Sequence, residues 1–194
     1  MKRFGRAVTT IAMAITLGAC NVSSPTSPSM VPFGAAPLTA NYTDTGGGSS
    51  GVLSDSDGSF ASFLASWNRS QIELGILAER LGDRDLIEYF GLQMIQESTL
   101  ALEQLDEISG VRLSQTSMDA THQQFYAQLS RMSGSAFDRM YMPMMVQSLL
   151  AFQQEIQRRN GSTSAATLRA HALDTLVQVS AQLAFARQLS TDVD

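Results

Sequence analysis

From residue 59 onward, apolar side chains recur at alternating steps of four and three residues, the repeat of a helix packed along one side against other helices. The first run of this repeat contains Phe60, Leu64, Trp67, Gln71, Leu74, Ala78 and Leu81. Similar runs extend over about 87–108, 137–156 and 168–189, and a shorter one covers about 118–132. Because no stretch alternates β-branched with polar residues, no strand competes with these helices. The pattern therefore predicts an all-α fold: an antiparallel four-helix bundle, with an extra short helix between the second and third long helices.

The first twenty residues have the composition of a secretory signal. Three basic residues lie within the first six positions, and an apolar run over residues 7–17 follows them. This run is shorter than the ~20 residues that span a bilayer. It leads into the string LGAC at residues 17–20, which resembles the lipobox of bacterial lipoproteins, in which the cysteine (here Cys20) is acylated and becomes the first residue. An ordinary secreted protein, cleaved nearby and carrying an unmodified cysteine, is the alternative.

We expect three regions along the chain: a lipoprotein signal peptide at 1–19, a tether at 20–58 and a helical domain at 59–194. The tether contains four of the five prolines and the run GGGSSG at 46–51. Such a segment buries too little apolar surface to offset its ordering entropy, so disorder is expected. Asn21 follows Cys20 where an aspartate would signal retention in the inner membrane. Lipoprotein sorting rules therefore predict an outer-membrane anchor with the bundle in the periplasm.

The charge balance and the scarcity of two residue types exclude several function classes. The chain has 13 basic and 18 acidic side chains, and the signal peptide removes three of the basic ones. This acidity argues against nucleic acid as a partner. The membrane, held through N-terminal acyl chains, is an expected partner, and the sequence names no protein partner or small ligand. Lys2 and Cys20 are the sole lysine and cysteine, so the mature chain has no Schiff-base lysine and no free thiol. A serine nucleophile would need His122 or His171 as its base, and no Gly-x-Ser-x-Gly turn is present.

Four short strings in the helical part carry a family resemblance: IELG at 72–75, GVRL at 110–113, MDATHQ at 118–123 and SGSAFDRMY at 133–141. They are similar to strings of a bacterial family of exported, ferritin-like domains, the domain of unknown function 4142. The last string is the most specific, because a Ser-Gly-x-x-Phe-Asp-Arg-x-Tyr pattern rarely arises by chance. The resemblance covers residues 60–190 and implies a four-helix bundle with ferritin-like connectivity, but no particular reaction.

The resemblance also implies where a metal site would lie, and this chain departs from the family there. The family pattern has an Asp-His pair in the second helix, another in the third and a His in the fourth, and ferritin-like bundles hold a metal pair with such residues. Here the second-helix pair reads Glu97-Ser98, the third-helix pair reads Ser148-Leu149, and the fourth-helix position is Gln182. An amide or a hydroxyl does not replace an imidazole or a carboxylate as a metal ligand. We therefore expect no metal and no cofactor at these positions.

The replacements still fall near the middle of their helices and define a core polar layer: Gln71, Glu97, Ser98, Ser148 and Gln182. A buried polar group without a partner costs about 1–3 kcal/mol, so we expect these groups to bond to one another or to trapped water. One interpretation is a vestigial active site that maintains the register of the bundle. The other is a set of tolerated polar residues, some of them at the surface.

Methionines crowd around Pro143 in the third long helix: Met140, Met142, Met144 and Met145. Thioethers hold copper(I), so this cluster is a candidate metal site. On a helix, however, Met142 points away from Met140 and Met144, and methionine at helical spacing also fills apolar cores. Both interpretations stay open from the sequence.

The two histidines complete the candidate residues. We expect His122, in the short helix, to be a surface residue, and His171 to be a hydrogen-bonded core histidine. No catalytic residue is predicted. The sequence favours a lipid-anchored cell-envelope bundle that acts as a non-catalytic binding or structural module with a degenerate metal site. The alternative is a periplasmic metalloprotein with a residual di-metal oxidase-like site or a methionine-based copper(I) site.

Overall fold

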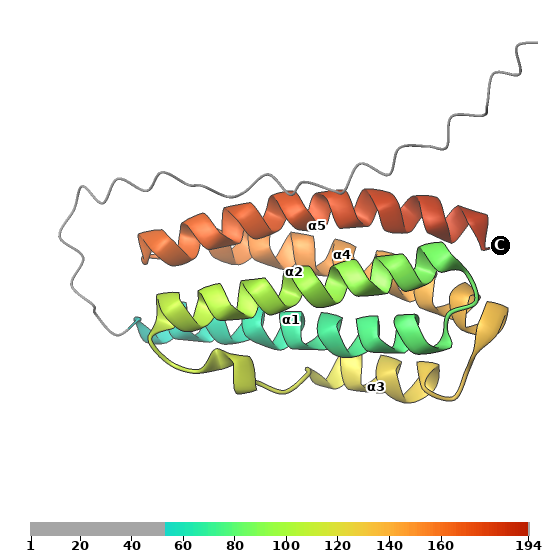
Figure 1. Ribbon diagram of the computed structural model, residues 1–194. Helices are drawn as coiled ribbons and strands as arrows, with labels where there is room; N and C mark the ends of the chain where they lie inside the picture. Colours follow the sequence, from blue (N-terminus) through green and yellow to red (C-terminus); the bar gives the residue numbers. More distant parts are fainter. Residues whose placement is uncertain (1–52, 194) are drawn as a thin grey trace, which may run out of the picture. The chain divides into compact units, whose positions relative to one another are not determined.

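The computed structural model describes residues 53–193, and this part of the chain is all-α (Figure 1). Its helices are α1 (Asp55–Leu81), α2 (Asp85–Ser109), α3 (Ala120–Leu129), α4 (Gly134–Asn160) and α5 (Ala166–Asp192), with a 3-10 turn η1 (Leu113–Gln115). The predicted all-α class is confirmed, and α3 is the expected short helix. The signal peptide, Cys20 and nearly all of the expected tether lie outside the described residues. Among residues 53–193, no helix combines the length and apolar character needed to cross a membrane.

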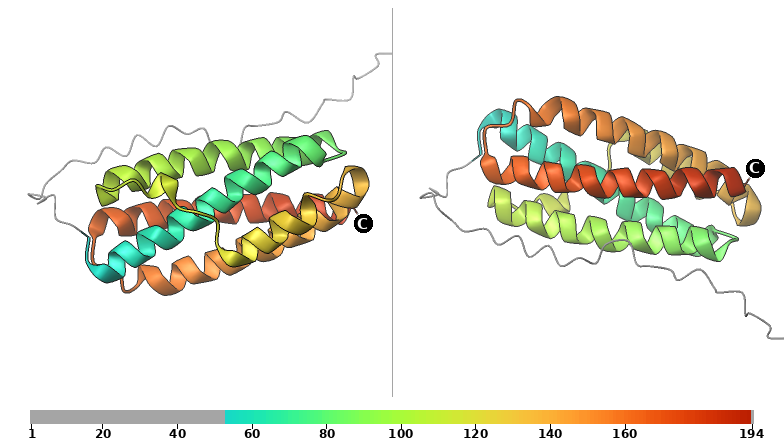
Figure 2. Two further views of the ribbon diagram at one scale, coloured as in Figure 1. Left: turned by 90° about the horizontal axis from the view of Figure 1, so that it is seen from below. Right: turned by 90° about the horizontal axis from the view of Figure 1, so that it is seen from above.

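The long helices lie side by side, each next to two others (Figures 1 and 2). Helix α1 packs against α2 and α4, and α5 packs against α4 and α2. Helices α1 and α4 are antiparallel, because Asp57 bonds to Ser164 just beyond the end of α4, whereas Asp83, just past the end of α1, bonds to Asp138 near the start of α4. Helix α2 therefore ends far from the point where α4 begins. The connection over residues 110–133 runs the length of the helices, and its α3 lies against α1 and α4.

The core forms where the seven-residue repeat places it. Apolar residues of the first run are buried: Phe60, Leu64, Trp67, Leu74 and Ala78. The Trp67 ring stacks on Phe152 of α4 with ring centroids 3.6 Å apart. Burial of such aromatic surface is among the largest single contributions to a core, so this stack holds α1 against α4.

Helix α1 begins at Asp55, so the expected domain start at Ser59 lies inside the helix. Its Asp57 is buried and accepts hydrogen bonds from the Ser164 backbone N–H at 3.1 Å, the Ser164 hydroxyl at 2.5 Å and the Ala165 backbone N–H at 3.2 Å. These N–H groups belong to the start of α5, where a helix leaves its first donors without internal partners. Burial by itself raises the pKa of Asp57, but the hydrogen bonds from Ser164, Ser54 and Ala165 leave it lowered. One carboxylate thus joins the beginnings of two helices.

Helices α1 and α2 approach most closely at a pair of glycines. A Cβ added at Gly75 would lie 2.6 Å from the Gly91 carbonyl oxygen and 2.9 Å from the Ile95 side chain. A Cβ added at Gly91 would lie 2.7 Å from the Gly75 carbonyl oxygen and 2.8 Å from the Cβ of Ala78. Because the nearest atoms are backbone, they cannot move aside as a flexible side chain would. The two glycines therefore set the distance between α1 and α2.

The string SGSAFDRMY forms the start of α4. Gly134 has a φ of +61°, the left-handed region that favours glycine. Phe137 and Tyr141 are fully buried, and their rings stack with centroids 5.1 Å apart. The Asp138 carboxylate accepts a hydrogen bond from the Asp83 backbone N–H at 3.2 Å, and its burial raises its pKa. This string therefore fixes the α1–α2 turn against α4, which is a role in packing.

Candidate functional site

The five residues of the polar layer come from all the long helices. Gln71 lies on α1, Glu97 and Ser98 on α2, Ser148 on α4 and Gln182 on α5. Gln71, Ser98 and Ser148 are buried, whereas Glu97 and Gln182 are half-buried. Three of the five are thus core residues, and two lie where the α2–α5 contact meets solvent.

Two members of the layer bond directly to each other. The Gln182 side-chain Nε2 donates to the Glu97 Oε2 at 2.5 Å and joins α5 to α2. Burial raises the pKa of Glu97, and the hydrogen bond from Gln182 only partly offsets this. The one carboxylate of the layer is therefore engaged by a neutral amide.

Gln71 does not form the hydrogen bonds to other members of the layer that were predicted for it. Its side chain is fully buried, and neither Nε2 nor Oε1 has a hydrogen-bond partner among the described residues. The Oε1 of Gln182 is likewise buried without a partner there. The side chains of the layer therefore do not form one continuous network, because Gln182 and Glu97 bond to each other and Gln71 bonds to neither.

Ser148 bonds to a residue that we expected at the surface. His122 is buried, with 7 % of its surface exposed, so the surface prediction for it was wrong. Its Nε2 lies 2.6 Å from the Ser148 hydroxyl oxygen, and its Nδ1 bonds to the Asp119 carboxylate. Asp119 also caps α3 by accepting from the His122 backbone N–H at 3.0 Å. The Asp-x-x-His spacing signals such a local pair, but nothing in the sequence identifies Ser148, 26 residues later, as its third member.

Asp119, His122 and Ser148 are arranged like the acid, base and nucleophile of a serine hydrolase. That chemistry also needs N–H donors beside the serine to stabilise an oxyanion. Ser148 lies well inside α4, where backbone N–H groups bond within the helix, and only 8 % of its surface is exposed. The backbone N–H groups at Ser148 are therefore engaged within α4, and the arrangement is suited to joining α3 to α4 by hydrogen bonds.

The metal candidates are dispersed. Residues 53–193 contain no group of three or more His, Cys, Asp or Glu side chains that could share an ion. His171 is buried on α5, as expected, but its Nε2 has no hydrogen-bond partner within the described part, and burial lowers its pKa. Among the methionines, Met142 and Met145 are buried in the core, whereas Met140 is 39 % exposed. These thioethers point to different environments and do not form one cluster.

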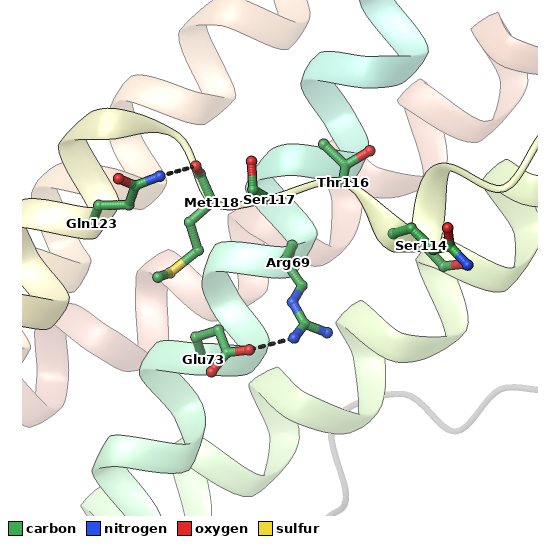
Figure 3. Close-up of a pocket in the computed structure, with 8 residues that line it drawn as sticks. Arg69, Glu73, Ser114, Thr116, Ser117, Met118 and Gln123 are labelled. Atoms are coloured by element: carbon green, nitrogen blue, oxygen red, sulfur yellow. Dashed lines mark hydrogen bonds and ion pairs between the residues drawn. The ribbon is translucent and has the colours of Figure 1, made fainter.

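A groove of about 560 Å³ lies between α1 and the connection that follows α2 (Figure 3). Its lining comes from Arg69 and Glu73 on α1, residues 114–118 of the connection and Gln123 of α3. The Arg69 guanidinium pairs with the Glu73 carboxylate at 2.6 Å along the groove. Glu73, Met118 and Gln123 belong to strings noted in the sequence for their family resemblance, but none of the residues predicted as a site lines the groove.

Comparisons with known proteins give one result. The family described as Domain of unknown function (DUF4142) matches residues 43–189, a range that includes the whole polar layer and the four strings that carry the family resemblance. Neither the curated proteins nor the solved structures give a match to this chain. Because the match covers well over half of its 194 residues, the chain belongs to the DUF4142 family of domains of unknown function.

Proposed function

We propose that the protein is an exported lipoprotein, anchored in the outer membrane through acylated Cys20, whose ferritin-like four-helix bundle acts in the periplasm as a non-catalytic binding or structural module. The anchor rests on the basic start, the short apolar run and the LGAC string at residues 17–20. Acyl chains bind a bilayer at about 0.8 kcal/mol per buried CH₂, and several chains hold far more firmly than one.

The directions of the helices support ferritin-like connectivity. Each long helix is antiparallel to the two neighbours that it contacts, and the connection over residues 110–133 crosses from one end of the helices to the other. One long crossover between the second and third long helices is what distinguishes ferritin-like bundles from simple up-and-down bundles.

The non-catalytic proposal rests on the hydrogen bonds of two side chains: Glu97, the acid of the polar layer, and His122, the imidazole that bonds to Ser148 of the layer. The Glu97 carboxylate is bonded to Gln182, and both ring nitrogens of His122 have partners. A metal pair in such a bundle needs several acids and imidazoles aimed inward together. In this chain Glu97 instead joins α2 to α5 and His122 joins α3 to α4, and these contacts support a structural role.

Two measurements on the full chain test this proposal. Radioactive palmitate should label the wild type and should not label Cys20→Ser, whereas an unlabelled wild type would refute the lipid anchor. Elemental analysis of the protein purified from membranes should find no stoichiometric iron, manganese, zinc or copper. A full complement of any of these metals would refute the metal-free module and favour a metalloprotein.

A further inference from the structure

The groove beside Arg69 has a composition that defines the chemistry of its ligand. We propose that it binds a neutral, polyhydroxylated ligand, that is, a carbohydrate. This inference rests on the proposed function as a binding module and assigns the ligand class of that module. The groove is distinct from the polar layer, since the two share no residue.

The charged side chains of the groove indicate the charge of its ligand. Among residues 53–193, Arg69 and Glu73 are the only charged residues that line the groove, and their side chains pair at 2.6 Å. An anionic ligand would need an unpaired cation, and a cationic ligand would need an unpaired carboxylate. Because each charge here is already neutralised by the other, the groove favours a ligand without net charge.

The second argument is hydrogen-bonding capacity. Gln115, Thr116 and Ser117 line the groove, and their side chains form no hydrogen bond within residues 53–193. Each of these hydroxyl and amide side chains offers both donors and acceptors. Hydroxyl groups of a sugar likewise donate and accept, so they can form hydrogen bonds with these side chains in several orientations. Met118 is the single apolar side chain that the described part of the chain contributes to the lining, which argues against an apolar ligand.

The third argument separates a sugar from an extended peptide. A peptide that adds as a strand needs unpaired backbone groups along one edge. Along this segment the Ser117 carbonyl accepts from the Ser66 hydroxyl at 2.9 Å, and the Met118 carbonyl accepts from the Gln123 amide at 2.7 Å. The Ser114 and Thr116 backbone N–H groups are also bonded, to Asp106 and to the Leu113 carbonyl. These four backbone groups are already bonded, which leaves the side chains of the segment as the main groups to recognise a ligand, in a space within the usual ~300–1,000 Å³ of small-molecule sites.

The test uses the full chain in a zwitterionic detergent that carries no sugar. Titration calorimetry with N,N′-diacetylchitobiose and maltose should detect binding of at least one of these neutral disaccharides. Co-sedimentation with insoluble cell-wall glycan, run in parallel, separates an envelope polymer from a free sugar as the source. Binding in either arm supports the proposal, and absence of binding in both overturns it. Preferential binding of inorganic phosphate would overturn the proposal, because the groove would then favour an anion. Preferential binding of tetra-alanine would overturn it too, because the groove would then favour a peptide.

Paired variants locate the site. Thr116→Val removes a lining hydroxyl at constant shape and should weaken binding about three- to tenfold, the effect of one neutral hydrogen bond. Thr121→Val, on the exposed part of α3 outside the groove, should leave affinity unchanged. Equal affinity of both variants would place any sugar site elsewhere and refute the assignment to this groove. Palmitate labelling of the same preparation shows independently whether the lipoprotein proposal stands, so the two proposals fail separately.

Discussion

Two neighbouring turns of α1 are packed in opposite ways. At Gly75 the backbone of α1 lies so close to α2 that an added Cβ would meet the Gly91 carbonyl oxygen at 2.6 Å. One turn earlier, Gln71 is equally buried, yet neither atom of its amide has a partner among the described residues. At Gly75 there is no room for an added atom, whereas at Gln71 the buried polar atoms form no hydrogen bond within the described residues. The sequence therefore fixes the distance between α1 and α2 more strictly than it fixes the hydrogen bonds of the polar layer.

The largest expected effect is at the close approach of α1 and α2. Gly75→Ala should lower the free energy of unfolding by about 3 kcal/mol, because the added methyl group must push two backbones apart. Gly58→Ala is the matched control in the same helix, since a Cβ there meets nothing within 4 Å. It should raise stability by about 0.5–1 kcal/mol through helix propensity. Urea unfolding of both variants measures the difference, and equal effects would show that the helices are not held at this distance.

The next effect concerns the carboxylate that joins α1 to α5. Asp57→Ala should lower the free energy of unfolding by about 2 kcal/mol, because it leaves buried N–H groups of the α5 terminus without an acceptor. Asp55→Ala, in the same first turn but exposed, should change it by about 0.5 kcal/mol or less. A chain that begins at Ser59 lacks both residues and should be destabilised like Asp57→Ala. Comparable effects of the two alanine substitutions would contradict this role for Asp57.

The same carboxylate predicts a pH dependence. Because the folded pKa of Asp57 is lowered, its contribution to stability is present above the ordinary aspartate pKa of about 4 and is lost as the pH falls through the lower folded value. The difference in unfolding free energy between wild type and Asp57→Ala should therefore shrink as the pH falls below about 4. A difference that grows on acidification would show that the folded pKa of Asp57 is raised.

A smaller effect tests the connection between α3 and α4. A double-mutant cycle of His122→Ala and Ser148→Ala should give a coupling free energy of about 1 kcal/mol, as expected for one buried hydrogen bond. The exposed pair Gln153 and Ser180, bonded at 2.8 Å, is the control and should couple by less than about half as much. Absence of coupling between His122 and Ser148 would mean that this bond does not hold α3 in place.

The smallest stability change is expected where the polar atoms have no protein partner. Gln71→Leu replaces a buried amide by an apolar side chain and should raise the free energy of unfolding by about 1 kcal/mol. Gln96→Leu, an exposed substitution on α2, should stay within about 0.5 kcal/mol of wild type. A loss of stability in Gln71→Leu would show that the amide makes interactions that the polar layer depends on.

The repeat beginning at Phe60 was enough to predict the helical class and the buried face of α1, because helical periodicity is a local property of the sequence. The number and order of the helices also followed from local signals such as the glycines after residues 81 and 109. Partners that are distant in sequence could not be predicted in this way. Nothing local links Asp57 to Ser164 or His122 to Ser148, and the surface prediction for His122 failed because its burial depends on α4. The positions of the polar layer along the helices could be predicted from the spacing of its residues. Its hydrogen bonds could not, because they join residues far apart in the sequence.

A positive control for metal binding places acids and imidazoles at the positions where the family resemblance implies metal ligands. The variant combines five substitutions: Gln71→Glu, Ser98→His, Ser148→Asp, Leu149→His and Gln182→His. Inward acids and imidazoles suit iron, manganese and zinc, so this variant should gain metal-dependent stability. Without metal it should be less stable than wild type, because buried acids and imidazoles would lack their counter-charge.

Whether the polar layer binds an ion, as a metalloprotein would require, is tested by the melting temperature of the unmodified full chain after metal removal. Melting is followed by circular dichroism, without added metal and then with saturating manganese, iron(II) or zinc. We expect no change in melting temperature with any of the three ions. An ion present at one hundred times its dissociation constant would stabilise the folded state by about 2.7 kcal/mol and raise the melting temperature by several degrees. A shift of that size in the unmodified chain would contradict the account.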